Sequence, residues 1–334
     1  MVHQLQARGG LLEVEFSAED VARTRFAVSP LWEVVASVRV LKGADEQGMH
    51  RWWAERVRVQ LAAAKLGLAP LSSLITVPTV GIPGFLVPPP TTPQPSLDVE
   101  LAALRSTAFA LLRTTSPGAQ AGVAALREDP ERGLSRLADV IAAYWEVALA
   151  PYWPRILTLL EGDIMYRAKR FAEGGTRRLF DDLDPQLTWE SGTLQMEHRC
   201  TRGVRQLDGR GLLLVPSAFT WPRIFSTLGS EDWQPTLRYP PRGIGTLWEQ
   251  RPQPCSNALA GVLGRTRALL LAELAAPAST TDLARRIAIS AGGVSQHLTA
   301  LREAGLVSAH RTGRVVLYAR TSVGEALMGA ARST

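Results

Sequence analysis

The sequence predicts a mainly α-helical protein with small β elements, in which a helical N-terminal domain precedes a smaller C-terminal domain. The length of 334 residues exceeds what a single hydrophobic core usually covers, which favours two domains. Apolar residues make up 46% of the chain and charged residues 20%, as in folded globular proteins. Apolar residues at helical spacing dominate the chain, whereas β-type residues are concentrated near residues 188–240.

The sequence shows no targeting or membrane-spanning segment. The apolar run "RALLLAELAAP" is broken by Glu273 and a proline, well short of the roughly 18 residues that a spanning helix needs. The start of the chain lacks the order of basic, apolar and small residues typical of a secretory signal. We therefore expect a cytoplasmic protein without membrane contact, in which Cys200 and Cys255 stay reduced.

The N-terminal region predicts a short strand followed by helices. "LLEVEF" is expected to form the strand, and Ser17 is a natural N-cap for a helix over "AEDVARTRF". Further helices are expected after Pro30 and over "MHRWWAERVRVQLAAAKLG". Residues 77–96 should be extended because their prolines lack amide donors. Helices resume over "LDVELAALRSTAFALLRTT" and from "GLSRLADV", the latter interrupted at Pro151 or Pro154.

From Thr188 the pattern changes to that of a small sheet. "TWESGTLQMEHRC", "GRGLLLVPSAF" and "QPTLRYP" combine β-type residues with glycine and proline punctuation. "RGVRQLDGRG" is expected to be a turn between the first two segments. "PPRGIGTLWEQRPQPCSN" predicts a linker, which divides the chain into domains 1–255 and 256–334.

The excess positive charge belongs to the C-terminal domain. Between Asn257 and Thr334 there are nine arginines and four acids, a net charge of +5, whereas residues 1–256 hold 28 basic and 27 acidic groups. Such an asymmetry favours a polyanionic partner.

The C-terminal domain predicts a series of helices and a hairpin. "RTRALLLAELA" is an amphipathic helix, and Ser279 with Asp282 fits a capping box for the next. Ser290 should cap a third helix over about 291–304. The strands "LVSAH" and "RVVLYAR" then flank a turn at Arg311-Thr312-Gly313-Arg314, within a hairpin over about 307–320.

The third helix predicts one buried and one polar face. Val294, Leu298 and Leu301 lie at i, i+4 and i+7 and form an apolar stripe, and Gly305 ends the helix. This order of elements is that of a winged helix-turn-helix, which places the third helix in the major groove of DNA and the hairpin against phosphates or the minor groove. The residues expected to contact double-stranded DNA are Ser290, Ser295, Gln296, His297, Thr299, Arg302, Arg311, Thr312 and Arg314. The alternative is a solvated helix face, and for Arg285 and Arg286 plain surface charge is favoured.

The segment "LGRTRALLLAELAAPASTTDLARRIAISAGGVSQHLTALREAGLVSAHRTGRVVLYART" resembles the ArsR (arsenic-repressor) type of bacterial transcriptional regulator. The resemblance implies a homodimer that binds a palindromic operator, usually as a repressor, with Ser295, Gln296 and His297 on the recognition helix and Arg311 and Arg314 on the wing. The N-terminal region resembles a helical region found in a subgroup of such regulators, for which no role is implied.

The sequence departs from the metal-sensing members of this family. Their ligand positions here read "TTDLARRI" and "TSVGEALMGAARST", without a thiol or an imidazole, so no metal is expected there. His198-x-Cys200 has no further ligands nearby and is expected to pack. No cofactor is expected. Gly292 and Gly293 each cost about 1 kcal/mol of helix propensity against alanine.

Aromatic residues on the N-terminal helices are candidates for a small-molecule effector pocket, since such pockets are concave and aromatic. The candidates are Trp32, Trp53, Tyr144, Trp145, Trp153 and Tyr166. The alternative, that they fill the core, is favoured. We expect no enzyme, because the sequence contains no G-x-S-x-G, H-E-x-x-H or glycine-rich phosphate loop. The rival interpretation is a catalytic or protein-docking N-terminal domain that the basic module tethers to DNA.

Overall fold

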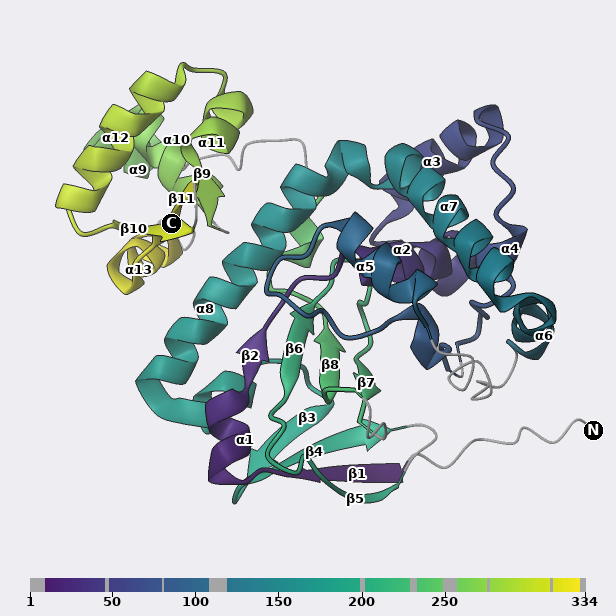
Figure 1. Ribbon diagram of the computed structural model, residues 1–334. Helices are drawn as coiled ribbons and strands as arrows, with labels where there is room; N and C mark the ends of the chain where they lie inside the picture. Colours follow the sequence, from purple (N-terminus) through teal and green to yellow (C-terminus); the bar gives the residue numbers. More distant parts are fainter. Residues whose placement is uncertain are drawn as a thin grey trace, which may run out of the picture. The chain divides into compact units, whose positions relative to one another are not determined.

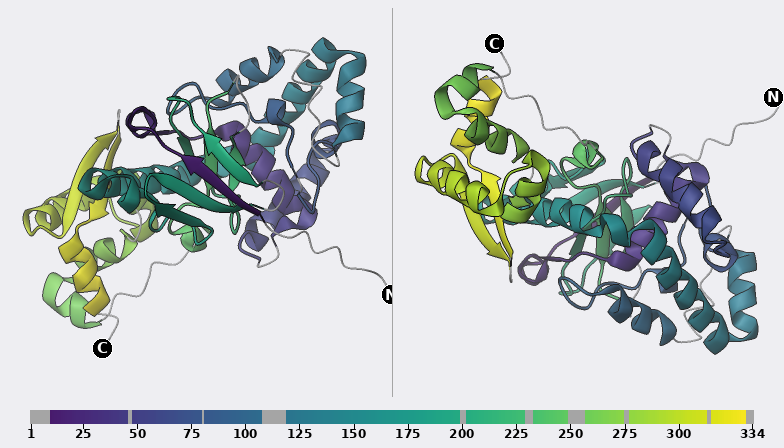
Figure 2. Two further views of the ribbon diagram at one scale, coloured as in Figure 1. Left: turned by 90° about the horizontal axis from the view of Figure 1, so that it is seen from below. Right: turned by 90° about the horizontal axis from the view of Figure 1, so that it is seen from above.

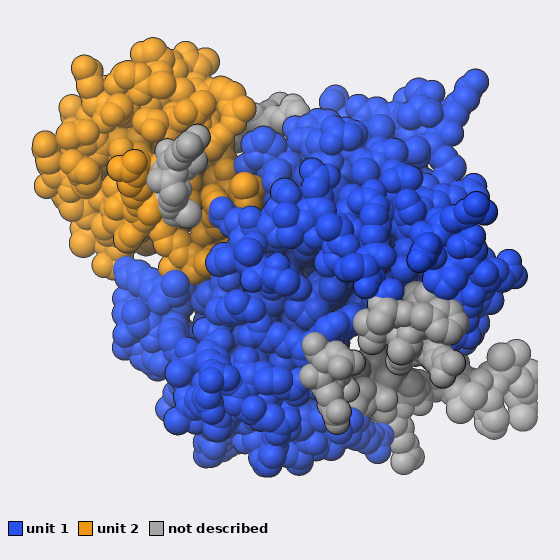
Figure 3. Space-filling model, viewed as in Figure 1, with its two compact units in different colours: residues 1–154, 166–241 blue, residues 155–165, 242–334 orange. Residues whose placement is uncertain are grey.

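The computed structural model describes residues 10–45, 48–79, 81–107, 119–198, 202–228, 233–248, 257–274, 277–312 and 315–330. The chain forms two compact units, residues 1–154 with 166–241 and residues 155–165 with 242–334 (Figure 3). The fold is mainly α-helical with small β elements, as predicted. The units differ from the expected division at residue 255, because 155–165 and the segment from 242 belong to the second unit.

The first unit holds most of the helices. These are α1 (Ala18–Arg23), α2 (Pro30–Arg39), α3 (Arg51–Ala63), α4 (Ala69–Ser72), α5 (Leu97–Arg105), α6 (Gln120–Glu128), α7 (Pro130–Ala148) and the greater part of α8 (Trp153–Phe180), with short turns η1 (Val40–Ala44), η2 (Gly84–Leu86) and η4 (Ala150–Tyr152). Helix α7 lies at the centre of this helical layer, since α2, α3, α4, α5 and α6 each pack on it (Figures 1 and 2).

The starts and ends of these helices follow local chemistry. Ser17 and Asp20 form a reciprocal capping box, in which the Ser17 Oγ accepts from the Asp20 N–H at 3.1 Å. Helix α1 ends at Arg23, earlier than predicted. The predicted interruption of the long helical segment occurs at η4, between α7 and α8. The helix predicted over residues 97–115 is present as α5, which ends at Arg105, and residues 108–115 of the prediction lie outside the described residues.

The strands of the first unit form separate sheets. Strands β3 (Leu187–Glu190), β4 (Thr193–His198), β1 (Gly10–Glu15) and β5 (Gly203–Gln206) are neighbours in one sheet, and β2 (Arg25–Phe26), β6 (Leu213–Pro216), β8 (Thr236–Tyr239) and β7 (Phe225–Thr227) in the other. The predicted turn "RGVRQLDGRG" was wrong, because it contains β5, which pairs in parallel with β1. All of β5 is exposed, so no apolar alternation marked it as a strand.

Buried side chains from both sheets and from the end of α8 share one core. Leu12 and Leu194 come from the first sheet, Leu214 and Leu237 from the second, and Phe180 from α8. The small sheet that the sequence placed near 188–240 therefore recruits strands from the start of the chain as well.

The second unit is a compact helical domain with a small sheet. Besides residues 155–165 of α8 it contains η5 (Ile244–Thr246), α9 (Asn257–Leu263), α10 (Arg265–Glu273), β9 (Ala278–Ser279), α11 (Thr280–Ile287), α12 (Ala291–Glu303), β10 (Val307–Thr312), β11 (Val315–Arg320) and α13 (Ser322–Ala330). Its core joins residues of α9 to α13, among them Leu271, Leu283, Leu298 and Met328. Of the helices that the structure describes in either unit, none has an apolar stretch long enough to span a bilayer.

Candidate nucleic-acid interface

Helix α12 has the two faces that the sequence predicts. Its N-cap is Ser290, whose Oγ accepts a hydrogen bond from the Gly293 N–H at 3.2 Å. Val294, Leu298 and Leu301 are at most 1% exposed and fix the inward side of the helix. These three residues and the cap are confirmed.

The end of α12 is a Schellman motif. Gly305 has φ +71, its N–H donates to the Arg302 carbonyl at 2.9 Å, and the Leu306 N–H donates to the Leu301 carbonyl at 2.9 Å. Glycine is favoured here because the left-handed conformation is unfavourable for residues with a Cβ atom. Both ends of α12 are therefore set by local hydrogen bonds.

The outward side of α12 exposes polar and basic groups. Ser295, Gln296 and Arg302 are exposed, and His297 and Thr299 are partly exposed. Among the described residues, no acidic side chain forms an ion pair with Arg302. The Ser290 hydroxyl differs from these outward side chains, because it accepts the capping hydrogen bond from the Gly293 N–H. Contact of any of these residues with DNA stays a prediction.

The predicted hairpin is present as β10 and β11. Arg311 lies opposite Val316 within the ladder, so this exposed arginine belongs to a strand and not to the turn in which the sequence placed it. The ladder continues to the pair Thr312 and Val315, and Arg314 lies outside the described residues. Strand β9 pairs with the far side of β11. A strand as short as β9 gives no readable alternation in the sequence.

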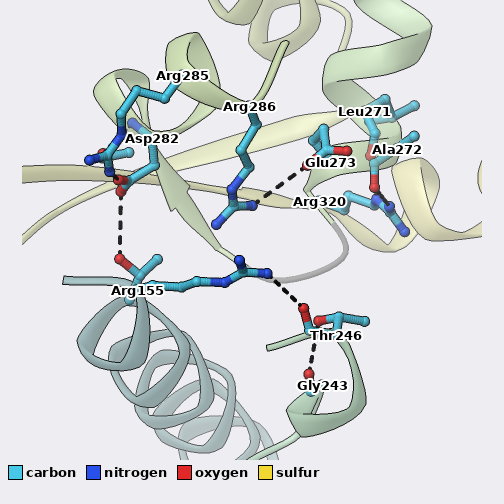
Figure 4. A network of polar contacts seen from close by, with 12 residues as sticks. Arg155, Gly243, Thr246, Leu271, Ala272, Glu273, Asp282, Arg285, Arg286 and Arg320 are labelled. Carbon is cyan, nitrogen blue, oxygen red and sulfur yellow. Dashed lines mark hydrogen bonds and ion pairs between the residues drawn. The ribbon is translucent and has the colours of Figure 1, made fainter. Parts of the chain in front are cut away.

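Arg285 and Arg286 are engaged within the domain. Arg285 pairs with Asp282, and the Arg286 Nη1 lies 3.7 Å from the Glu273 Oε2 (Figure 4). Both acids are largely buried, with side chains 16% and 11% exposed. These pairs favour a structural role for the two arginines over phosphate contact.

Arg320 is an arginine of the hairpin whose structural role the sequence did not reveal. Its side chain is 2% exposed, and the guanidinium donates to the carbonyls of Leu271 and Ala272, each at 2.6 Å (Figure 4). These carbonyls belong to the last turn of α10, where a helix runs out of amide donors of its own. Arg320 therefore ties β11 to the end of α10 instead of facing solvent.

The first turns of α8 complete this unit. The Thr158 Oγ1 donates to the Asp282 carboxylate at 3.5 Å. The Arg155 Nη2 donates to the Thr246 carbonyl at 3.0 Å (Figure 4). Gly162 faces Pro277 so closely that an added Cβ would lie 2.8 Å from its Cδ. The sequence gave no signal for this packing, because the partners are separated by many residues.

Three of the predicted effector residues are buried in the first unit. The indole N–H groups of Trp32 and Trp53 donate to the Thr220 Oγ1 and the Ala148 carbonyl, both at 2.9 Å. The Tyr144 hydroxyl lies 2.9 Å from the Ser37 Oγ, and its burial raises the pKa of the phenol. Trp32, Trp53 and Tyr144 are thus buried core residues, as the alternative interpretation of the sequence expected.

The remaining aromatic candidates lie elsewhere on the unit. Trp145 and Trp153 are partly exposed and meet edge to face with ring centroids 4.9 Å apart. The Tyr166 hydroxyl donates to the Asp182 Oδ2 at 2.7 Å. An open cavity of about 620 Å³ in the same unit is lined by other residues, namely Ala22, Arg23, Thr24, Arg25, Arg210, Trp233 and Gln234. A ligand role for the six aromatic residues stays a prediction.

Comparison with known families gives two separate matches along the chain. Residues 263–308, from the end of α9 to the start of β10, match a helix-turn-helix domain family. Residues 85–244 match a family of unknown function, DUF5937. No curated protein and no solved structure is similar enough to the chain to match it.

Proposed function

We propose that this DNA-binding transcriptional regulator, which carries a C-terminal helix-turn-helix domain, acts as a homodimeric repressor of the ArsR type on a palindromic operator. The observation that carries the proposal is the outward face of α12, where Ser295 and Gln296 are exposed one turn into the helix. In this class of module the first turns of the recognition helix contact base edges in the major groove. Serine and glutamine side chains can exchange hydrogen bonds with those edges.

The charge of the domain supports a nucleic-acid partner. Residues 257–334 have a net charge of +5, and the exposed arginines of the described part include Arg265, Arg267, Arg302 and Arg311. Contacts to phosphates set the position of the protein on the duplex, and contacts to bases set the sequence. Arg302 is well suited to phosphate contact. It lies on α12 three residues after Thr299, and among the described residues it has no acidic partner.

Two exposed valines of the second unit are the positions at which we propose that two copies meet. In the described part of the second unit, the exposed large apolar side chains are Val262 on α9 and Val323 on α13, with exposures of 80% and 60%. Both helices pack on α10. A dimer would supply the two half-sites that specific binding in a genome requires.

The test of this function is selection of bound sequences from a random DNA pool by the purified full chain at a stated near-physiological salt concentration. An inverted repeat with half-sites one helical turn apart is the expected result. Recovery of no sequence motif would contradict sequence-specific binding, and a motif without symmetry would contradict the dimer.

Gln296→Ala should weaken binding to the selected operator by about 1–3 kcal/mol while leaving the affinity for random DNA nearly unchanged, because a base contact is lost.

Arg302→Ala should lower both affinities and reduce the salt dependence, because a phosphate contact is lost. Gln60→Ala, at an exposed helical position of the first unit, is the matched control. Fluorescence anisotropy over a salt series measures these effects, and equal losses on both DNAs for Gln296→Ala would refute base reading.

A catalytic first unit is the rival function, and buried carboxyl groups favour it. Burial raises the pKa of Glu33 to about 8 and that of Glu100 to about 7, and such shifts are common at active sites. However, Glu33 accepts from the Ala218 N–H at 2.8 Å and from the Ser217 hydroxyl at 3.2 Å, and Glu100 accepts from the Leu31 N–H at 2.7 Å. These bonds suit carboxyls that hold loops and helix starts in place, so we propose a non-catalytic first unit that receives an effector.

A further inference from the structure

The open cavity of the first unit lies at one edge of the sheet that contains β2, β6 and β8. These strands run parallel and side by side, with Arg25 opposite Leu213 and Leu213 opposite Thr236 (Figure 1). The three strands therefore start at the same edge, where Arg25 opens β2 and where Arg210 and Gln234 directly precede β6 and β8. The resulting cavity of about 620 Å³ is within the roughly 300–1,000 Å³ range of small-molecule sites.

Hydrogen bonds hold the polar wall of this cavity in place. The Arg25 Nε donates to the Gln234 Oε1 at 3.1 Å, and the Arg25 Nη2 donates to the same oxygen. The Gln234 Nε2 donates to the Arg210 carbonyl at 3.2 Å, and the Arg210 Nη1 donates to the Trp233 carbonyl at 3.2 Å. The two guanidinium groups are thus ordered before a ligand arrives, which lowers the entropy cost of binding.

The positive charge of the cavity wall is only partly compensated. The residues that line the cavity include Arg23, Arg25 and Arg210 and no acid. The Arg23 Nη2 lies 2.6 Å from the Glu19 Oε1, and the Arg210 Nη2 lies 3.6 Å from the Asp208 Oδ2. For Arg25, the described residues supply a neutral amide and no carboxylate, and its Nη1 has no partner among them. One positive charge of the wall is therefore left for a ligand.

Trp233 gives the same cavity an aromatic wall. Its indole lies so close to Gly84 that a Cβ added there would be 2.7 Å from the Trp233 Cζ3. The Trp233 side chain is partly exposed, and within the described part of the chain its indole N–H has no hydrogen-bond partner. An indole backed by the main chain and bordering a cavity offers a surface on which a second ring can pack.

We propose that this cavity binds a small aromatic monocarboxylate, with the carboxylate on the Arg25 guanidinium and the ring against the Trp233 indole. Carboxylates accept short, charge-assisted hydrogen bonds from arginine. A single negative charge matches the single uncompensated arginine, whereas a phosphate group of about two charges exceeds it. This inference deepens the proposed function by naming the site and the chemistry of the effector, and only its regulatory part rests on that function.

The first test measures how four probes bind to the full chain in calorimetric titrations without DNA. Phenylacetate has both the ring and the charge, phenylacetamide lacks the charge, cyclohexylacetate lacks the aromatic ring, and inorganic phosphate has charge alone. Phenylacetate should bind with a dissociation constant of about 1 mM or below, as expected for so small a ligand. Each of the other probes should bind about tenfold more weakly or not at all, because one of the two interactions is missing.

Arg25→Gln should weaken phenylacetate binding about tenfold or more and abolish the preference for phenylacetate over phenylacetamide, because a charge-assisted hydrogen bond is lost. A purely structural role for Arg25 predicts a lower midpoint of thermal unfolding with this preference unchanged. Ala22→Phe is the second variant, because Ala22 is an exposed residue of α1 that lines the cavity. The larger side chain should fill the cavity and weaken binding while the arginines stay in place.

Arg56→Gln is the matched control, because Arg56 is an exposed arginine outside the cavity lining whose Cζ lies 4.5 Å from the Trp52 ring centroid. This variant should bind phenylacetate as the wild type does.

Several results would overturn the site. No binding of phenylacetate at about 10 mM would refute it, since even a weak site for a ligand of this size is partly filled there. Binding that survives both Arg25→Gln and Ala22→Phe would place the ligand elsewhere. Equal binding of cyclohexylacetate or of inorganic phosphate would contradict an aromatic carboxylate as the ligand.

The regulatory part is tested separately, by measuring the affinity for the selected operator with and without phenylacetate. An unchanged affinity would refute regulation through this site. Failure to bind any DNA sequence would refute the proposed function and leave the carboxylate site standing, whereas operator binding without any phenylacetate binding would do the opposite.

Discussion

Ala288, between α11 and α12, has φ 56 and ψ 42, a left-handed conformation that glycine adopts far more readily. The conformation lets the Ile289 N–H donate to the Ala284 carbonyl at 3.3 Å, so that the chain turns directly from one helix into the next. The turn that orients α12 is therefore held by a residue under backbone strain.

Ala288→Gly should stabilise the second unit by about 0.5–1 kcal/mol, since relief of the left-handed strain exceeds the added freedom of the unfolded chain. Ala284→Gly is the control, because the same change inside α11 should destabilise by about 1 kcal/mol. Urea unfolding of the full chain, followed by a probe on the second unit, measures both. Loss of stability in both variants would show that Ala288 is not strained.

At the level of single residues, the sequence predicted what depends on near neighbours. Ser290, Gly305 and the stripe of α12 could be identified because caps and helical faces repeat at fixed spacings. Arg320 and Arg39 could not, because a long side chain can reach partners on distant elements and the sequence does not say which. The exposed face of α12 was predictable because it consists of the positions that lie outside the buried stripe.

Among the elements, α2 is fully buried along its length, and it carries a carboxyl group into the interior. The Glu33 side chain is 0% exposed and meets the start of the segment after β6 through the Ala218 and Phe219 N–H groups. The pKa of Glu33, raised by burial from 4.5 to about 8, means that folding takes up a proton there at neutral pH. Glu100 behaves in the same way, with a pKa raised to about 7.

These shifts predict that the unfolding free energy of the first unit falls as pH rises from 6.5 to 8. A carboxyl with a raised folded-state pKa contributes its full stabilisation at low pH and loses it as pH rises through that pKa, by up to about 1.4 kcal/mol per pH unit. The predicted pH range begins at 6.5 because burial lowers the pKa of His50 to about 4. Below pH 6.5 the unfolded chain protonates His50 while the folded protein does not, which destabilises the folded state.

Glu33→Gln should flatten this dependence, because the amide does not titrate. Glu55→Gln, at an exposed position of α3, is the control and should leave the dependence unchanged. Urea unfolding at pH 6.5 and pH 8, at constant ionic strength, measures the difference. A protein whose first unit is equally stable at both values would contradict a neutral, buried Glu33.

Element prediction succeeded where periodicity was strong and failed where an element is short or exposed. Helices α2, α3, α7 and α12 follow apolar repeats over several turns, so their existence could be predicted. Strand β5 has no buried residue and β9 is very short, so both depend on partners that the sequence does not reveal. Strand β1 pairs with β4, which is far away in the sequence, so this pairing could not be predicted from local patterns either.

For the molecule as a whole, the proposed homodimer can be tested at the exposed valines of α9 and α13. Combined Val262→Asp and Val323→Asp should weaken dimerisation by about 2 kcal/mol or more, because charges would enter an apolar contact. Val59→Asp is the matched control, since Val59 is 70% exposed on α3 of the first unit. Sedimentation velocity over a concentration series measures the association. A dimer as tight as that of the wild type would place the interface elsewhere.

The division of α8 between the units has a consequence for the order in which the protein forms during synthesis. Residues 155–165 leave the ribosome before the whole of 166–241, yet they pack with the domain that begins at 242. The contacts of Gly162 with Pro277 and of Thr158 with Asp282 can therefore form only after residues 277–282 have been synthesised. A fragment that starts at residue 257 would lack Thr158 and Gly162, and would therefore expose the surface around Asp282 and Pro277 that these residues cover in the full chain.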